Sequence, residues 1–332
     1  MRVLLLSIWK PSRGGVVTHV EKIIENSKND FTVIGYPEAL NLPVFRAFGY
    51  IIYGFFRAVI LSGRKKFDVV HAHYAFPQGF LGFLLSRVLG IPLVLTLHGS
   101  DINVLGRSRL GKPLVSFVLR HSDYICAVSE HLKREAVKLG ADENKVEVVY
   151  GAPGTESLKD RKPEKGEILF VGSSVRQKGL DVLLDAFKIV RKRIPWAKLS
   201  VVGGGMKEEV ASGVSFLGFR EKLDEFYSRA EVVVIPSREE GLSLVALEAM
   251  ALGIPVVASR VGGLPEILEG RAILVEKENP SALAEAIIKL LDDEKFREKL
   301  SKKEVRFTGR RLGENMDRIY TRAKDGSLEF FL

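Results

Sequence analysis

The stretch from Val232 to Glu266, VVVIPSREEGLSLVALEAMALGIPVVASRVGGLPE, constrains the fold of this chain more than any other. A short apolar run, Val232 to Pro236, is followed by a polar loop, a helical pattern that opens near Leu242, and a second apolar run, Pro255 to Ser259. Short continuous apolar runs are typical of parallel strands that are buried on both faces. The stretch therefore predicts a strand-helix-strand unit within a parallel sheet.

Two glutamates flank the start of the predicted helix. Glu240 lies in the loop and Glu248 lies in the helix, eight positions later. A helix that begins after a glycine, here Gly241, offers free backbone N–H groups and the positive end of its dipole, which together suit a phosphate. Taken alone, the glutamate pair is equally compatible with a solvated helix start. The pattern by itself predicts an anion site with carboxylates on either side.

The same alternation of strands and helices runs through the whole chain and predicts an α/β protein with doubly wound parallel sheets. In the first half we expect strands at Arg2 to Ile8, Phe31 to Gly35, Asp68 to His73, Leu93 to Leu97, Tyr124 to Val128 and Val146 to Val149. In the second half we expect strands at Ile168 to Gly172, Leu199 to Gly203, Val232 to Pro236, Pro255 to Ser259 and Ala272 to Val275. Ligands of such sheets bind beyond the carboxyl ends of the strands.

The length of 332 residues allows two domains, each with its own core. Glycine, proline and charged residues dominate the stretch from Gly151 to Gly166, which is typical of a linker. We expect an N-terminal Rossmann-like domain at 1–152, a linker at 153–166, a second Rossmann-like domain at 167–306 and a final helical segment at 307–332.

Composition excludes several classes of protein. The single cysteine, Cys126, excludes a disulfide framework and a cysteine-rich zinc site. The opening MRVLLLSIWKPS has an apolar run too short for a signal peptide, and no segment has the roughly 18 uncharged apolar residues that span a bilayer. We expect a cytoplasmic protein, either free or peripheral at a membrane. The scarcity of glutamine beside abundant lysine, arginine and glutamate hints at a thermophilic source.

The net charge of +9 indicates a phosphate-bearing or anionic partner. The sequence has no zinc-finger spacing, RNA-recognition aromatic motif or basic leucine-zipper pattern, so we do not expect nucleic acid. A nucleoside diphosphate and an anionic lipid surface explain the charge equally well.

The run EEGLSLVALEAMALGIPVVAS followed by GGLPE resembles the Glu-x7-Glu signature of glycosyltransferase family 4. The resemblance implies the GT-B fold, in which two Rossmann-like domains face each other across a cleft and the last helix crosses back to the first domain. It also implies that the protein is a retaining transferase that uses a nucleoside-diphosphate sugar. In the family the second glutamate, here Glu248, binds ribose hydroxyls, and the first, here Glu240, orients the donor sugar. The residues around the helix start are expected to line the donor: Gly241, Leu242, Ser243 and Leu244.

Two elements of the first half resemble family motifs. Gly14 and Gly15 follow the first strand in a turn that lacks the nicotinamide-binding G-x-G-x-x-G pattern. They are either a simple turn or the family's Gly-Gly loop, which approaches the donor phosphate. His98 and Asp101 resemble the family's His-Gly-x-Asp element, which implies a role for His98 at the transferred sugar or the acceptor.

Two further histidines, His71 and His73, lie on an expected strand with Ala72 between them. We expect their side chains to point to opposite faces, so that they do not form a metal-binding pair.

The segment VGSSVRQKGLD in the second half resembles the family's Gly-Arg and Lys-Gly elements, whose Arg and Lys hold the diphosphate. Lys178 matches the lysine, and a cation at a helix start is unfavourable unless an anion binds there, which favours a functional lysine over a solvated one. Ser173 stands where the family has its arginine. Arg176 could supply the charge instead, or the Ser173 hydroxyl could donate one hydrogen bond. Gly218 and Phe219 resemble the family's segment near the base.

The resemblance implies that His98, Glu240 and Lys178 carry the reaction. No Asp-x-Asp metal motif is visible, so fixed protein cations would stabilise the leaving diphosphate in place of a divalent ion, and we expect neither a metal nor another cofactor. The acceptor, a glycan, a lipid or a small molecule, is left open. A nucleotide-sugar epimerase of the same fold and a non-catalytic binding protein are the alternatives.

The run from Val44 to Lys66 is strongly apolar and ends in Arg64, Lys65 and Lys66. It predicts either a core helix followed by a solvated basic turn, or an interfacial helix that contacts anionic membrane lipid.

Overall fold

The computed structural model describes residues 1–9, 14–35, 43–158, 161–204, 212–304 and 306–326, with residues 43–46 described only in their backbone. Residues 159 and 160 of the expected linker and the end of the tail therefore lie outside the described residues. The chain divides into two compact units. The N-terminal unit comprises residues 1–152 and 308–332, and the C-terminal unit comprises residues 153–307.

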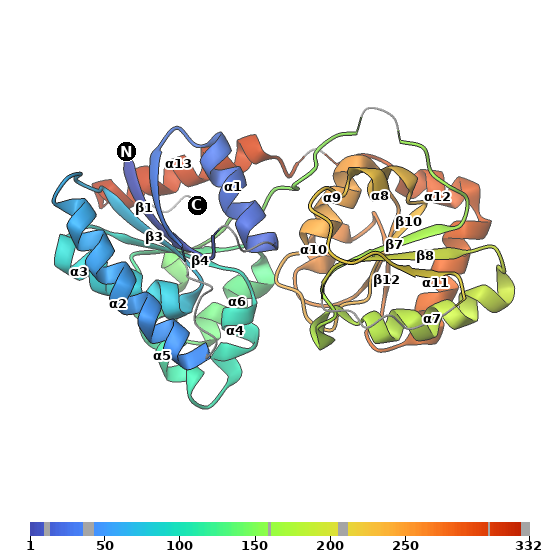
Figure 1. The fold of residues 1–332 in the computed structure, drawn as a ribbon, viewed down its shortest axis with the longest axis horizontal. Helices are drawn as coiled ribbons and strands as arrows, with labels where there is room; N and C mark the ends of the chain where they lie inside the picture. Colours follow the sequence, from blue (N-terminus) through green and yellow to red (C-terminus); the bar gives the residue numbers. More distant parts are fainter. Residues whose placement is uncertain (10–13, 36–42, 159–160, 205–211, 305, 327–332) are drawn as a thin grey trace. The chain divides into compact units, whose positions relative to one another are not determined.

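The N-terminal unit is built on a sheet of six parallel strands in the order β2-β1-β3-β4-β5-β6 (Figure 1). Each strand is a short apolar run, and every residue of β3 and β4 is buried, as expected of central parallel strands. The strands are β1 (Arg2–Ser7), β2 (Asp30–Gly35), β3 (Val69–His73), β4 (Leu93–Leu97), β5 (Tyr124–Ala127) and β6 (Val146–Val148).

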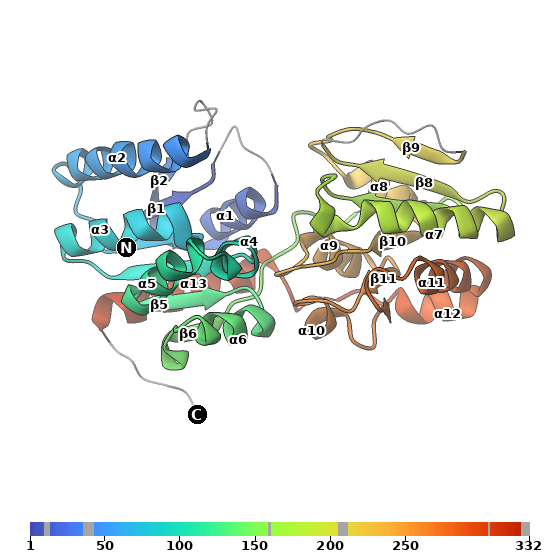
Figure 2. The ribbon, with the colours of Figure 1, turned by 90° about the horizontal axis from the view of Figure 1, so that it is seen from below.

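Helices cover both faces of this sheet. Helices α1 and α13 pack against each other on one face, and α2, α3 and α5 lie together on the other (Figures 1 and 2). The helices are α1 (Gly15–Asn26), α2 (Pro43–Ser62), α3 (Phe80–Leu89), α4 (Ser100–Asn103), α5 (Gly111–His121), α6 (Glu130–Lys138) and α13 (Gly309–Asp325), with short turns η1 (Ala75–Gly79), η2 (Leu105–Arg107) and η3 (Glu143–Lys145).

Helix α13 completes the N-terminal core although it is last in the sequence. Its apolar side packs with Val3, Ile23 and Val69 in one buried cluster. Gly313 allows the close crossing with α1, because a Cβ there would lie 2.3 Å from the carbonyl oxygen of Asn26. The carboxylate of Asp317 accepts hydrogen bonds at the end of α1, including one of 2.7 Å from Asn29 Nδ2. The chain therefore needs its last helix to close its first core.

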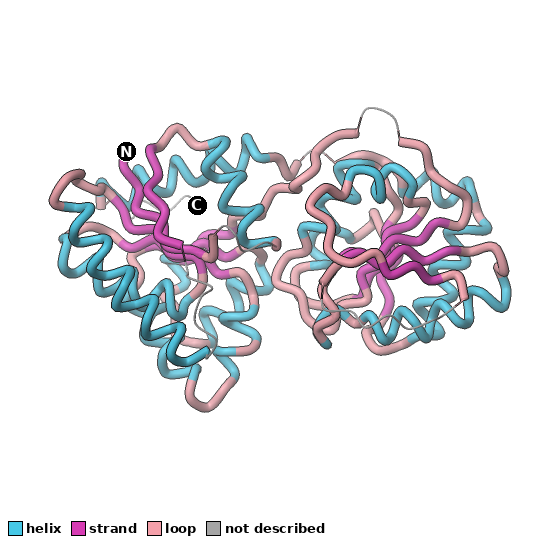
Figure 3. Tube along the Cα trace, in the orientation of Figure 1, coloured by secondary structure: helices cyan, strands magenta, loops and turns pink. Residues whose placement is uncertain are grey.

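The C-terminal unit has a second sheet of six parallel strands, in the order β12-β11-β10-β7-β8-β9. Figure 3 shows these strands as a layer between helices. The strands are β7 (Glu167–Val171), β8 (Lys198–Val202), β9 (Val214–Phe216), β10 (Val232–Ile235), β11 (Val256–Ser259) and β12 (Ile273–Val275). Strand β9 was not among the expected strands, because its three residues carry too short a pattern.

Helices α7 and α11 pack together on one face of this sheet, and their apolar sides share one core cluster with the strands. On the other side α9 contacts β10 and β11, and α8 contacts β7. The elements are η4 (Arg176–Lys178), α7 (Leu180–Arg193), α8 (Asp224–Arg229), α9 (Leu244–Leu252), α10 (Leu264–Leu268), α11 (Pro280–Asp292) and α12 (Glu294–Leu300). Both sheets confirm the expected α/β, doubly wound architecture.

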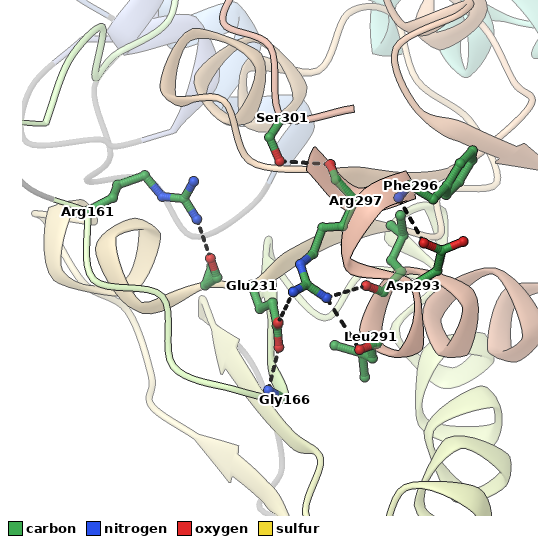
Figure 4. Close-up of polar contacts among 10 residues, drawn as sticks. Arg161, Gly166, Glu231, Leu291, Asp293, Phe296, Arg297 and Ser301 are labelled. Atoms are coloured by element: carbon green, nitrogen blue, oxygen red, sulfur yellow. Dashed lines mark hydrogen bonds and ion pairs between the residues drawn. The ribbon is translucent and has the colours of Figure 1, made fainter. Parts of the chain in front are cut away.

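Buried polar contacts fix the connection that follows residue 152 to the C-terminal unit (Figure 4). Arg161 donates to the carbonyl oxygens of Ala230 and Gly253, at 2.6 and 3.0 Å. Glu231 accepts from the Gly166 N–H at 2.5 Å and pairs with Arg297 at 3.1 Å. The hollow of about 600 Å³ beside these groups is lined by none of the expected site residues. We therefore interpret the charged residues around this hollow as contacts that stabilise the packing of the C-terminal unit.

Candidate functional site

One candidate site lies where the strand order of the C-terminal sheet reverses, between β7 and β10. Strands β7 and β10 are neighbours there, and their following loops leave toward opposite edges of the sheet. Such a switch point is where open α/β sheets bind ligands. Lys178 follows β7 and Glu240 follows β10. The two residues most strongly expected to bind the donor therefore lie at this switch point.

Lys178 and Glu240 form the centre of this site. The Lys178 ammonium donates to both carboxylate oxygens of Glu240, at 2.8 and 3.1 Å. The Ser237 hydroxyl donates to Glu240 Oε2 at 3.0 Å. Glu240 is buried, whereas one third of the Lys178 side chain is exposed. An ammonium has three donors, so Lys178 can hold Glu240 and still donate to an anion on its exposed side.

Two glycines make this pair possible. Gly179 has φ +66°, and a Cβ on it would lie 2.0 Å from the carbonyl oxygen of Pro236. Gly262 has φ +56°, and a Cβ on it would lie 1.7 Å from the carbonyl oxygen of Glu240. The Lys-Gly and Gly-Gly segments therefore press directly on the loop that carries Glu240.

Glu248 belongs to a second hydrogen-bonded set on helix α9. Its carboxylate accepts from the Gly154 N–H at 3.1 Å and from the Tyr227 hydroxyl. Burial, followed by the charge of Glu248, raises the pKa of Tyr227 well above its ordinary value, so the tyrosine stays a donor. These two contacts hold the Glu248 carboxylate in one orientation.

Helix α9 begins two residues later than expected. It spans Leu244–Leu252, and Ser243 is its N-cap, accepting from the Ala246 N–H at 3.3 Å. The expected donor-binding residues Gly241 and Leu242 lie in the loop before the cap.

The remaining candidates of this unit are exposed. Ser173 lies in the loop after β7, Arg176 lies in η4, and Gly218 and Phe219 follow β9. Gly205 lies outside the described residues.

Two residues of this region were missed by sequence reasoning. Arg238 donates to the carboxylates of Asp181 at 2.7 Å and Glu278 at 2.8 Å. These hydrogen bonds, the one to Asp181 first, raise the pKa of Arg238. These two ion pairs hold the loop that leads to Glu240 in place. Tyr227 lies on α8, 21 positions before Glu248. No local spacing signals either contact, because both depend on which strands are neighbours.

The strand order of the N-terminal sheet reverses between β1 and β3, and the candidate site residues of this unit lie near that point. Helix α1 begins after Gly14, whose φ of +121° favours glycine. Gly14 and Gly15 are exposed. Asp101 is buried and accepts from the Gly99 N–H at 2.9 Å and the Ala75 N–H at 3.2 Å, which closes the loop after His98. Burial raises the pKa of Asp101 to about 6.

His98 lies within a group of four histidines. His73 Nδ1 and His98 Nε2 are 2.9 Å apart and share a hydrogen bond. His19 of α1 has its ring centroid 5.1 Å from that of His98, almost perpendicular. His71 hydrogen-bonds to Tyr320 at 2.8 Å and Thr96 at 2.7 Å. The expectation that His71 and His73 point to opposite faces is wrong: their ring centroids are 4.3 Å apart, because residues two apart on a strand share a face.

Burial keeps these imidazoles neutral. It lowers the pKa of His19 to about 4 and, with a smaller effect of His19, that of His71 to about 3. The same cause, followed by the neighbouring histidines, holds the pKa values of His73 and His98 well below the ordinary value. At neutral pH His98 is therefore a neutral group that can accept or donate one hydrogen bond at each nitrogen.

Comparison with known proteins gives both halves of the chain a match. Residues 13–152 match the family described as Glycosyltransferase Family 4, and residues 165–293 match the family described as Glycosyl transferases group 1. An uncharacterised glycosyltransferase of Methanocaldococcus jannaschii is 35% identical over 93% of each chain. The N-acetyl-alpha-D-glucosaminyl L-malate synthase of Bacillus anthracis is 30% identical over 71% of this chain and 68% of its own.

Solved structures show the same fold. The Anabaena protein HepE in complex with UDP superposes with a TM-score of 0.78, covering 97% of this chain and 100% of its own, at 17% identity. At that identity the likeness concerns the fold.

Proposed function

Because this chain belongs to glycosyltransferase family 4, we propose that it transfers a sugar from a nucleoside-diphosphate sugar to a hydroxyl group of an acceptor, with retention of the anomeric configuration. The observation that carries the proposal is the Lys178–Glu240 pair at the switch point of the C-terminal sheet, with the ammonium partly exposed. The UDP bound to the Anabaena protein of the same fold supports a nucleoside diphosphate as part of the donor.

In the proposed reaction the bond between the anomeric carbon and the diphosphate oxygen breaks, and a bond from that carbon to the acceptor oxygen forms on the same face. The acceptor hydroxyl gives its proton to the departing phosphate. Lys178 stabilises the negative charge that grows on the diphosphate, an effect of about 3–4 kcal/mol for a fixed donor in a dry site. Arg176 or the Ser173 hydroxyl assists, and Gly218 and Phe219 lie toward the base.

The two glutamates have separate roles in this proposal. Glu240 orients the donor sugar and holds the Lys178 ammonium toward the phosphate, because the two already form a salt bridge. Glu248 binds ribose hydroxyls, with Tyr227 and Gly154 fixing its carboxylate. His98 contacts the transferred sugar or the acceptor from the N-terminal unit. In this proposal the positive charges of protein side chains stabilise the leaving diphosphate in place of a divalent ion.

A nucleoside diphosphate should raise the melting temperature of the protein, and Lys178→Ala should abolish most of that rise. A ligand at about 100 times its dissociation constant stabilises by about 2.7 kcal/mol, roughly 5 to 11 °C for a unit of this size. Lys188→Ala is the matched control, since Lys188 lies on the adjacent helix α7 and pairs with Asp185 on the surface. If none of the common nucleoside diphosphates shifts the wild type, the transferase and the epimerase proposals both fail.

We further propose that the N-terminal unit contacts anionic membrane lipid. Helix α2 exposes a row of large apolar side chains between 52% and 63% accessible: Phe48, Ile52, Tyr53, Phe56 and Ile60. Val88 of α3 and Phe117 of α5 are exposed beside it, at 59% and 36%. These three helices lie on one face of the sheet (Figure 2). The apolar face is therefore wider than one helix.

Most charged residues in the sequence of this face are basic. Between Val44 and Ser100 the sequence has one acidic residue, Asp68, which pairs with Lys324 at 2.8 Å. The basic residues of the same stretch include Arg57, Arg64 and Arg87. An apolar face with aromatic side chains and a basic surround suits the interface of an anionic bilayer. None of the described helices is long and apolar enough to cross a membrane, so the proposed contact is peripheral.

The protein should sediment with vesicles of phosphatidylcholine and phosphatidylglycerol, and much less with phosphatidylcholine alone. Ile60→Glu should lower the bound fraction several-fold, because it places a negative charge within the apolar face. Ile189→Glu is the matched control, an exposed isoleucine on α7 of the other unit. Equal, negligible binding to both kinds of vesicle would remove the membrane proposal and leave the transferase proposal intact.

A further inference from the structure

Three histidines from different elements converge at the switch point of the N-terminal sheet. His19 comes from α1, His73 ends β3, and His98 follows β4. One ring nitrogen of each lies within 4.8 Å of the corresponding atoms of the other two, and among the described residues this is the group that meets the spacing of a metal site. Three ligands from three elements that a sheet holds together make a preformed arrangement rather than a chance surface cluster.

The geometry is close to that of a three-histidine metal centre. Zinc binds imidazole nitrogen at about 2.0–2.1 Å, so ligand nitrogens around a tetrahedral ion are about 3.4 Å apart. One ring nitrogen of each of the three histidines lies within 4.8 Å of those of the other two. Ring movements of about 1 Å would bring these nitrogens to the spacing of ligands around one ion.

One polar atom of the cluster is not satisfied by the described residues of the protein. His73 is fully buried, and its Nε2 atom has no hydrogen-bond partner within the described part of the chain. A buried nitrogen without a partner costs about 1–3 kcal/mol. The cluster thus carries a polar group that its own side chains do not satisfy.

A second layer of contacts holds the cluster in place. The His71 ring lies 4.3 Å from that of His73, and its two nitrogens are fixed by Tyr320 and Thr96. The His71 ring therefore limits the movement of the His73 ring against it. Helix α13 supports these contacts through Tyr320, which is fully buried.

We propose that His19, His73 and His98 bind one divalent transition-metal ion, with zinc as the expected ion, and that the bound ion blocks sugar transfer. Imidazole ligands suit zinc, cobalt, nickel and copper, and three protein ligands leave one position open to water or substrate. The inhibitory half of the proposal rests on the proposed function, because the ion would hold the His98 ring, which in that function contacts the sugar or the acceptor.

The test is equilibrium dialysis of the full chain against zinc chloride, with bound metal measured by mass spectrometry. We expect one zinc ion per chain, and an affinity at least about tenfold lower in His19→Gln and in His73→Gln. His121→Gln is the matched control, because His121 lies on α5, hydrogen-bonded to the Phe117 carbonyl oxygen, outside the cluster. Glutamine keeps a polar group of similar size, and circular dichroism checks that each variant folds.

Cobalt provides a readout that needs no variant, since cobalt bound by three imidazoles in a four- or five-coordinate site absorbs visible light. No visible absorption in the wild type, or equal zinc binding in the wild type and the His19→Gln/His73→Gln double variant, would overturn the site. Zinc binding that leaves turnover unchanged would overturn the inhibitory half. None of the binding measurements needs a nucleotide sugar, so their failure and that of the proposed function are distinguishable.

Discussion

Lowering the pH from 7 to 5 should reduce the stability of the N-terminal unit by several kcal/mol and its melting temperature by more than about 10 °C. The cause is a group of four histidines, of which His19, His71 and His73 are buried and His98 is partly buried. Each is neutral in the folded protein and takes up a proton when unfolded below pH 6.5. The unfolded state then binds more protons, so stability falls as the pH falls.

The groups packed against the cluster decide the size of this effect. Asp101 acts in the opposite sense, because burial raises its pKa to about 6 and the folded state therefore gains a proton more readily than the unfolded state. Its shift is smaller than that of His19 or His71, whose pKa values fall to about 4 and about 3. Tyr74 and Tyr320 have raised pKa values and do not titrate in this range. The histidines therefore dominate between pH 5 and pH 6.5.

Hydrogen exchange of the amides of β3 and β4 as a function of pH measures this stability locally. Each histidine contributes a slope of up to about 1.4 kcal/mol per pH unit, so His19→Gln should flatten the slope by about that amount. His121→Gln, outside the cluster, should keep the slope of the wild type. An exchange rate in β3 that is independent of pH after correction for the intrinsic rate would contradict the neutral, buried cluster.

Glu240→Ala should lower the turnover of sugar transfer by about 100- to 1000-fold while the affinity for nucleoside diphosphate changes little. The estimate is the usual loss when one preorganised group is removed from a reacting centre. Lys178 and the start of α9 remain to hold the phosphates, so binding survives. The carboxylate that orients the sugar and the ammonium is gone, so the reacting atoms lose their alignment.

Glu248→Ala should lower the affinity for nucleoside diphosphate, in contrast to Glu240→Ala, which should lower turnover. The alanine also leaves the Tyr227 hydroxyl and the Gly154 N–H unpaired in a buried place, at about 1–3 kcal/mol each. Glu248→Gln keeps an acceptor for both and separates the loss of affinity from a loss of stability. Glu285→Ala, an exposed glutamate on α11, is the matched control. If Glu240→Ala loses affinity and Glu248→Ala loses turnover, the two roles are exchanged.

Much of the fold could be predicted from the sequence because it depends on local patterns. Among the residues that the structure describes, short apolar runs marked eleven of the twelve strands, and β9, with three residues, was missed. The alternation of strands and helices predicted parallel sheets, and both sheets are parallel throughout. A thermophilic source remains a prediction from composition.

The contacts of the site were less predictable because they join distant segments. The sequence motifs pointed to Lys178 and Glu240, and the strand order explains why they meet. Strands β7 and β10 are neighbours although their first paired residues, Ile168 and Val232, are 64 positions apart in the sequence. The contacts of Tyr227 with Glu248 and of Arg238 with Asp181 arise from the same order, and no spacing announces them. The histidine group was missed because His71 and His73 were assigned to opposite faces. That assignment misapplied the alternation rule, which places residues two apart on the same face of a strand.

The most direct test of sugar transfer is a mass-spectrometric screen of nucleotide sugars, each incubated with the protein in the presence and absence of a mixture of glycan, lipid and small-molecule acceptors. The proposed function predicts that one donor is consumed only when an acceptor is present, with release of its nucleoside diphosphate and a gain of one sugar mass by the acceptor. Conversion of a donor into an isomeric sugar nucleotide without any acceptor would identify an epimerase instead. A protein that binds a nucleoside diphosphate but consumes no donor under any condition would contradict catalysis altogether.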